Sequence, residues 1–508
     1  MDKKKSIINI VISVISKIIT MAIMIVSRKA LLQYLGEEAL GIYSLYTNLI
    51  GVLAVAELGI GVSITFSMYK PIVEGESDSI SSLYYLYKKI YLVLSIIVFF
   101  LGLIITPFLS VFAKGSSGDI DIQLPFIIFL ASTCISYFYA QKTSLINAFK
   151  DNYINLIIET IVKVLALIMQ LLLLGVIKTM EVYTLAILVS TLVQWIVTNF
   201  VYNSKYKRYI NGNRTLKPEI KKEVITNTKA MIYHKLGTLM VNTASGLIIS
   251  SFLSVIILGI YSNYLIIMTG MISVLSLVFS STTSIIGHSF VKNDKESFYK
   301  NFRFFHMINF ILALVFFIGF LSVIQPLLTL FFPESELLSD QVVFIFTITY
   351  FVQFMRQVTL TFRDASGLFY YDRYKPLIEG IINVIISLVL VNILGLVGIL
   401  IANLLTTIFI CHTVEAHIIY KYGFGRQNTK FLLYNLILLI IFIMVGTVTV
   451  QLVTYFEGPL LSVILYSGIL SLMLSFTTLL ILSIFIKDFR LLFKSILNRI
   501  NKIIKHDV

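Results

Sequence analysis

Six ionisable side chains interrupt stretches of sequence that are otherwise almost entirely apolar. Four are cations and two are acids: Lys17, Lys163, Lys235, Arg356, Glu57 and Glu159. Charged groups in an apolar setting are costly unless they pair with one another or line a polar cavity. The excess of cations therefore predicts a basic, water-filled cavity. Such a cavity suits the binding of an anion, above all a phosphate group that Lys and Arg can hold by charge-assisted hydrogen bonds.

The spacing of these residues separates two cases. Glu159 and Lys163 are four positions apart with the acid first, which predicts a pair on one helix face, and two readings stay open: an internal pair, or one end lent to a substrate. Lys17, Lys235 and Arg356 have no acid three or four positions away. Each of these three needs a partner on another helix, water or a bound anion.

Composition identifies the solvent of these helices. Of 508 residues, 58% are hydrophobic and 13% charged, and the mean hydropathy is +0.92. Soluble domains carry about 25% charged residues. The chain is therefore expected in lipid, where spanning segments need about 20 apolar residues and satisfied backbone groups. The apolar runs lack a period of two, so we expect helices in an all-α fold.

Fourteen runs are long enough to span a membrane. They cover 6–27, 41–67, 84–112, 123–147, 153–174, 181–202, 230–256, 259–288, 305–332, 341–362, 377–394, 396–419, 431–454 and 459–486. With a cytoplasmic N-terminus, 31 of the 40 Lys and Arg residues fall on inner segments and four on outer segments: Arg28, Lys29, Lys114 and Lys178. This bias predicts that both termini are cytoplasmic. The net charge of +14 thus reports topology, and we expect no nucleic-acid partner.

A repeat runs through the sequence. The word "LGIYSLY" (40–46) returns 218 residues later as "LGIYSNY" (258–264), with six of seven letters unchanged. Later matches keep nearly the same register: Pro107 with Pro326, Asp151 with Asp372, and Glu159 with Glu379. Because each copy holds six helices, both copies enter the membrane from the same side, as in transporters built from parallel repeats.

The repeat predicts five parts. They are a six-helix bundle (1–202), a basic cytoplasmic linker (203–229), a second six-helix bundle (230–420), two extra helices (421–486) and a basic amphipathic cytoplasmic tail (487–508). In such folds the substrate lies between the repeats, and one bundle rocks against the other. We expect Lys17, Lys163, Lys235 and Arg356 to line that space, with Glu57 and Glu159 nearby.

With two six-helix repeats, two extra helices and the segment "LGIYSLYTNLIGVLAVAELGIGVSITFSMYKPI" (40–72), the chain resembles the polysaccharide transport, or oligosaccharide flippase, family of the MATE-like exporters. The resemblance covers essentially the whole chain. It implies flipping of an undecaprenyl-diphosphate-linked oligosaccharide across the bacterial cytoplasmic membrane for surface polysaccharide. It also implies membrane lipids and a polysaccharide polymerase as partners.

Two other functions are alternatives. A MATE-type drug or cation antiporter shares this architecture, but those antiporters favour acids and a proline in their first helix. The predicted span 6–27 has neither, and its one charged residue is Lys17. A polysaccharide polymerase or ligase resembles proteins with a large external loop, whereas the long hydrophilic loop here is predicted inside. No nucleotide, zinc or catalytic-triad motif is present, and we expect neither a cofactor nor an enzymatic activity.

Topology is the first testable prediction. Cysteines introduced by Gly118→Cys and Gly212→Cys should react oppositely with a membrane-impermeant thiol reagent. The first should react in intact cells, because residue 118 lies on the predicted outer side, and the second only in opened cells. Equal labelling of both from outside would contradict the model of two parallel bundles.

Overall fold

The computed structural model describes residues 3–57, 60–212, 243–280 and 295–486, with isolated positions between these ranges and Phe489 and Arg490. Lys235, most of the predicted linker and nearly all of the predicted tail lie outside the described residues. The described chain is helical and contains no strand, and its contacts divide it into two compact units. Unit 1 comprises residues 1–270 and 376–399, and unit 2 comprises 271–375 and 400–508.

The elements of unit 1 follow the chain to residue 270 and resume at 376. They are α1 (Lys3–Leu53), η1 (Ala54–Glu57), α2 (Ile60–Glu74), α3 (Ser77–Ile105), η2 (Thr106–Phe108), α4 (Leu109–Phe112), α5 (Gln123–Tyr137), α6 (Ala140–Ala148), α7 (Asn152–Val176), α8 (Met180–Val201), η3 (Tyr202–Tyr206), η4 (Lys207–Tyr209), η5 (Ile249–Leu253), most of α10 (Val255–Ser280) and nearly all of α15 (Lys375–Leu394).

Unit 2 holds α12 (Lys295–Thr329), η6 (Glu334–Glu336), α13 (Asp340–Met355), α14 (Gln357–Ala365), η7 (Leu368–Tyr370), most of α16 (Leu396–Thr406), η8 (Thr407–His412), α17 (Thr413–Ile418), η9 (Ile419–Phe424), α18 (Thr429–Val453) and α19 (Leu460–Phe485). The contact-based units group helices by packing and not by repeat. The predicted division into bundles 1–202 and 230–420 therefore stays a prediction.

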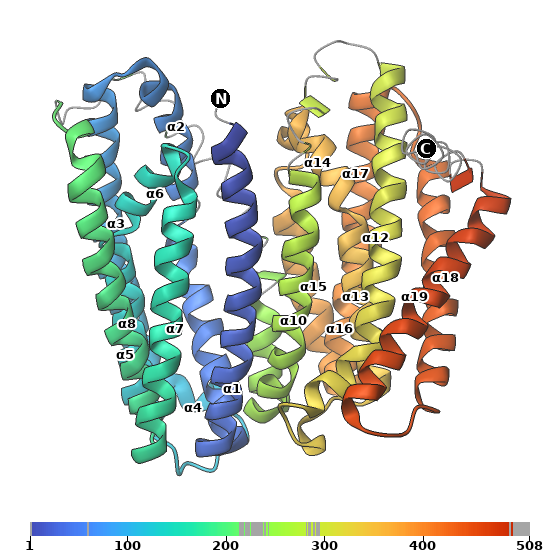
Figure 1. The fold of residues 1–508 in the computed structure, drawn as a ribbon, viewed down its shortest axis with the longest axis horizontal. Helices are drawn as coiled ribbons and strands as arrows, with labels where there is room; N and C mark the ends of the chain where they lie inside the picture. Colours follow the sequence, from blue (N-terminus) through green and yellow to red (C-terminus); the bar gives the residue numbers. More distant parts are fainter. Residues whose placement is uncertain are drawn as a thin grey trace, which may run out of the picture. The chain divides into compact units, whose positions relative to one another are not determined.

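Helix α1 contains a reversal at Gly36. A straight helix would place residues 16 positions apart about 24 Å from each other. Instead, Arg28 Nη2 lies 3.1 Å from Ser44 Oγ, and Gly36 has a φ of +84°, which glycine adopts without strain. The segments 3–35 and 37–53 are thus two helices folded back on each other. Figure 1 shows the chain of unit 1 running away from the N-terminus and returning beside it at α2.

The described residues confirm a multi-pass, all-α membrane fold. They contain eleven helices long and apolar enough to cross a membrane, or twelve if α5 and α6, bent by 42°, form one span. One of these is α1, so the predicted spans 6–27 and 41–67 both begin within it. The predicted span 230–256 is represented only by a short apolar helix, Thr243–Leu253. The count of fourteen stays a prediction.

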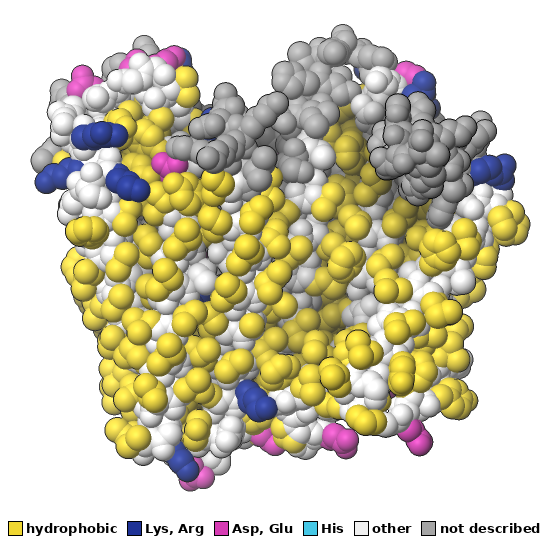
Figure 2. Space-filling model, in the orientation of Figure 1, with side chains coloured by type: hydrophobic (Ala, Val, Ile, Leu, Met, Phe, Trp, Pro, Cys, Tyr) yellow, Lys and Arg dark blue, Asp and Glu magenta, His cyan; other side chains and the backbone are white. Residues whose placement is uncertain are grey.

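The surface has the polarity that lipid requires. Large apolar side chains are exposed along the helices, for example Ile104, Leu172 and Ile469, while Ser81, Thr347 and Ser467 are buried. In Figure 2 hydrophobic side chains cover the helices on the drawn face, and most charged side chains lie towards helix ends. Many of the helices therefore expose apolar side chains, as expected of a protein dissolved in a bilayer.

The two copies of the repeated word contact each other inside unit 1. A β-carbon on Gly41 would lie closer than 3.0 Å to the carbonyl oxygen of Val255, and one on Gly259 would lie 3.0 Å from the amide nitrogen of Gly41. The second half of α1 and the start of α10 thus meet backbone to backbone, as small residues allow in membranes. Contact between equivalent positions is what an axis relating two copies produces, although superposition of the halves stays a prediction.

Arg28 joins the same two segments. Its Nε donates to Asn263 Oδ1 at 2.6 Å, and its Nη2 donates to Ser44 Oγ and to the carbonyl oxygen of Gly259 at 3.0 Å. The side chain is buried. The prediction that Arg28 lies in an outer loop is therefore wrong: the first helix continues to residue 35, and Arg28 is a buried link between the two copies of the word.

The glycine contact can be tested by adding one methyl group. Gly41→Ala should lower the thermal unfolding midpoint of the purified protein, because overpacking costs about 1–3 kcal/mol and the obstructing atom belongs to the backbone. Gly468→Ala is the matched control in another membrane helix, where nothing lies within 4 Å of the new carbon. Equal midpoints for both variants would contradict the packing described.

Candidate substrate-binding site

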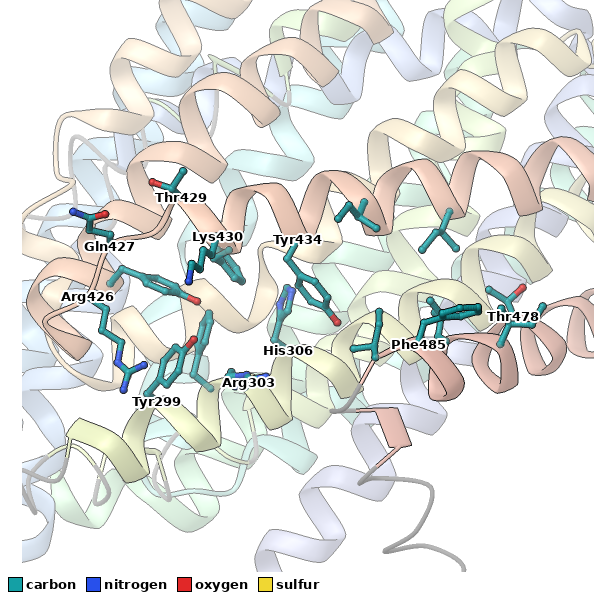
Figure 3. A pocket seen from close by; sticks show the side chains of 18 of the residues that line it. Tyr299, Arg303, His306, Arg426, Gln427, Thr429, Lys430, Tyr434, Thr478 and Phe485 are labelled. Atoms are coloured by element: carbon teal, nitrogen blue, oxygen red, sulfur yellow. The ribbon is translucent and has the colours of Figure 1, made fainter.

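Unit 2 has an open cavity of about 1340 Å³ between α12, η9, α18 and α19. One end is lined by polar and cationic side chains: Arg303, Arg426, Gln427, Thr429 and Lys430. The other end is apolar and includes Ile441, Met444, Ile481, Leu482 and Phe485. Figure 3 shows the labelled polar residues gathered at one side, with Phe485 and Thr478 at the other and His306 and Tyr434 between them.

Helical spacing aims these side chains at one space. On α12, Tyr299, Arg303 and His306 are four and then three positions apart, so they share one face. On α18 the lining residues recur at the same spacing: Lys430, Tyr434, Ile437, Ile441, Met444 and Val445. Because α18 rises about 1.5 Å per residue, its lining face is roughly 22 Å long. The cavity thus changes from cationic to apolar along a path comparable with one leaflet.

The polar end carries positive charge on an aromatic floor. Its described lining residues include three cations and no acid. The guanidinium of Arg426 lies 4.2 Å from the ring centroid of Tyr299, a cation–π contact, and its Nη2 lies 2.5 Å from Glu296 Oε2. The Arg303 guanidinium lies 5.9 Å from the same ring. This arrangement suits an anion that also presents a flat or apolar face.

His306 lies in the middle of the cavity wall and is buried. Its ring packs 4.9 Å from Phe431 and 6.0 Å from Phe302, centroid to centroid. No group of three or more His, Cys, Asp or Glu side chains in the described part of the chain is placed to hold a metal ion. Cys134 and Cys411 are buried and are not joined in a disulfide.

Arg356 has an acidic partner that the sequence analysis missed. Its Nε and Nη2 donate to the two carboxylate oxygens of Glu415 at 3.0 and 2.6 Å, and Lys375 Nζ donates to the same carboxylate at 2.5 Å. The Glu415 side chain is only 1% exposed. Two cations thus neutralise one buried acid, and Arg356 is part of a structural network in unit 2.

Glu159 and Lys163 form the internal pair that their spacing indicated. Lys163 Nζ lies 2.6 Å from Glu159 Oε1, and both side chains remain partly exposed. The structure therefore brings these two predicted residues together on α7. The alternative reading, that one end binds substrate, stays a prediction.

Glu57, Lys17 and Lys235 are the remaining predicted residues. Glu57 ends η1, where the regular helix of 37–53 gives way to a 3₁₀ turn, and it accepts a hydrogen bond from the Tyr91 hydroxyl. Lys17 is half-buried on α1, and Lys235 lies outside the described residues. That Lys17, Lys163, Lys235 and Arg356 line one water-filled space stays a prediction.

One signal could have revealed the Arg356 partner. Glu415 falls within the predicted span 396–419, so it is an ionisable residue at membrane depth like the six that were singled out. Its 59-residue separation from Arg356 gave no local spacing to join them. The cavity of unit 2 had no such signal, because part of its lining comes from α18 and α19, which the repeat analysis treated as an addition.

No protein-family model and no curated protein matches this chain. Solved structures share its fold. The inward-facing conformation of a multidrug resistance MATE family transporter of the MOP superfamily has a TM-score of 0.65 and 16% identity, covering 78% of this chain and 94% of that one. The lipid II flippase MurJ in its inward closed conformation has a TM-score of 0.65 and 14% identity, covering 94% of this chain and 98% of that one.

A third similar structure is a MOP-superfamily transporter from Pyrococcus furiosus, with a TM-score of 0.51 and 15% identity, covering 80% of this chain and 96% of that one. The chain is thus a multi-pass membrane protein with the fold of MOP-superfamily transporters. This agrees with the superfamily-level resemblance seen in the sequence. The narrower resemblance to polysaccharide flippases stays a prediction.

The buried network yields a stability prediction. Glu415→Gln should lower the thermal unfolding midpoint strongly, because it removes the buried carboxylate that both Arg356 and Lys375 contact, a loss of about 3–5 kcal/mol. Glu74→Gln is the control, since the Lys70–Glu74 pair is exposed and 3.9 Å long and exposed pairs contribute little. If both variants unfold at the wild-type temperature, the network is not structural.

Proposed function

We propose that this protein is a flippase that moves an undecaprenyl-diphosphate-linked oligosaccharide across the bacterial cytoplasmic membrane for surface polysaccharide synthesis. The observation that carries the proposal is the two-ended cavity of unit 2, which is cationic and aromatic at one end and apolar at the other. A lipid-linked sugar has the same two parts joined by a diphosphate. A small hydrophilic solute would make no favourable contacts with the apolar end.

Each part of such a ligand has matching side chains. Arg303, Arg426 and Lys430 would hold the diphosphate by charge-assisted hydrogen bonds. The rings of Tyr299, Tyr420 and Tyr434 would supply flat faces and hydroxyl groups to the first sugar. The prenyl chain would lie against α18 and α19, where Ile437, Met444 and Ile481 are exposed.

Two features favour a flippase over a MATE-type drug antiporter. The cavity presents three cations, which repel the cationic substrates of such antiporters. In addition, the similarity to the lipid II flippase extends over 94% of this chain, against 78% for the MATE transporter. The difference of 16 percentage points is close to the share of the chain that follows residue 420, which includes α18 and α19 of the cavity wall.

The proposal includes an alternating-access mechanism. The two repeats, 1–202 and 230–420, would rock against each other while both termini stay in the cytoplasm. Lys17, Lys163 and Lys235 would offset the phosphate charge during passage, with Glu57 and Glu159 balancing them. Arg356 would contribute through the network that Glu415 holds in place.

The test is a flipping assay with the purified chain in liposomes that contain fluorescent undecaprenyl-diphosphate-linked N-acetylglucosamine. The triple variant Arg303→Gln, Arg426→Gln, Lys430→Gln should slow the appearance of label in the opposite leaflet at least tenfold. The reason is that one hydrogen bond to a charged group contributes about 1.5–3 kcal/mol. Stability should change little, because Arg303 and Lys430 are exposed and the Arg426 side chain is 44% exposed in a partly exposed ion pair.

A second triple variant, Lys205→Gln, Lys207→Gln, Arg208→Gln, removes the same charge from exposed positions outside the cavity. It should flip the probe at the wild-type rate. Equal rates for the two triple variants, or no flipping by the wild-type protein, would overturn the proposed function.

A further inference from the structure

A carboxylate outside the cavity lining already contacts one cation of the cationic end. Glu296, in the first turn of α12, places its Oε2 2.5 Å from Arg426 Nη2, and the two side chains are 55% and 44% exposed. The pair ties the segment before α18 to the start of α12. Glu296 itself does not line the cavity, but the arginine that it holds does.

Arg426 is held in place from three sides. Its backbone amide donates to the carbonyl oxygen of Tyr420 at 2.9 Å. Its guanidinium lies over the ring of Tyr299 at 4.2 Å from the centroid, and the Glu296 carboxylate meets it at the edge. The ring covers a face of the guanidinium, so the edge is where an oxyanion binds. A carboxylate and a phosphate present the same kind of oxygen to that edge.

An anionic ligand that takes the Nη2 position of Arg426 must therefore displace Glu296. The exchange replaces one charge-assisted contact with another, so binding gains less than it would at an unoccupied arginine. The same contact re-forms when the ligand leaves. A transport site needs binding that is strong enough to capture and weak enough to release, and an internal competitor meets that need.

We propose that Glu296 competes with the phosphate groups of the ligand for Arg426 and thereby sets the affinity and the release of the diphosphate. The inference rests on the proposed function, because it assumes a phosphate-bearing lipid in this cavity. Glu296 is a specificity-determining residue that acts through Arg426. Its removal strengthens ligand binding, which is the opposite of the effect expected from a residue that merely positions the arginine.

The test measures binding of farnesyl diphosphate, a short prenyl diphosphate, to the purified full chain by isothermal titration calorimetry. Glu296→Gln should lower the dissociation constant about tenfold, and Arg426→Gln should raise it at least tenfold. In the Arg426→Gln background, Glu296→Gln should change the constant less than twofold, since the contested guanidinium is gone. Such a cycle isolates the pairwise effect from general charge.

Glu74→Gln is the matched control, because it also removes an exposed acid from an ion pair but lies outside the cavity lining. It should bind the probe as the wild-type protein does. If the wild-type protein binds and Glu296→Gln binds equally or more weakly, the competition is overturned while the proposed function stands. If the wild-type protein binds farnesol as well as farnesyl diphosphate, the phosphate site fails, and the proposed function fails with it.

Discussion

The cost of charge in hydrocarbon governs how this protein is built. A cation at the centre of a bilayer costs about 2.5–3.5 kcal/mol even on the most lenient scale. The described charges respond in three ways: Glu415 is enclosed by two cations, Arg28 donates to three acceptors within unit 1, and Arg426 lies near a helix end over an aromatic ring. Where each charge can be satisfied decides which helices must be neighbours.

The same constraint separates a structural charge from one that can bind a ligand. Glu415 is almost completely enclosed, so the groups that hold it are not open to an incoming ligand in the way that surface cations are. The cations at the polar end of the unit 2 cavity are exposed, so a ligand can reach them. The apolar path that leads away from them along α18 and α19 gives an attached chain somewhere to lie. Helices outside the repeat are thus what turns a cationic surface into a site for a lipid.

The predictable part of this fold was local. Apolar length placed the helices, and the four-residue spacing of Glu159 and Lys163 identified a real ion pair, because both rest on the geometry of one helix. Contacts between distant segments were not predictable from spacing. Arg356 and Glu415 are 59 positions apart. Arg28 could not be distinguished from a loop residue, because the sequence does not show whether a helix ends with its apolar run or continues beyond it. The cavity forms where four separate segments converge. The sequence of any one segment does not predict that arrangement.

The meeting of Gly41 with the start of α10 explains why one phrase of the sequence is written twice almost unchanged. At most positions a substitution in one copy does not affect the packing of the other copy, because the two equivalent residues are not in contact. Where the two copies touch at equivalent positions, each packs directly against the other. A β-carbon added to Gly41 or Gly259 would therefore meet backbone atoms of the other copy. A substitution at either of these two glycines then disturbs the same contact. Within the shared letters of 40–46 and 258–264, Gly41 and Gly259 are the positions at which this contact leaves no room for a side chain.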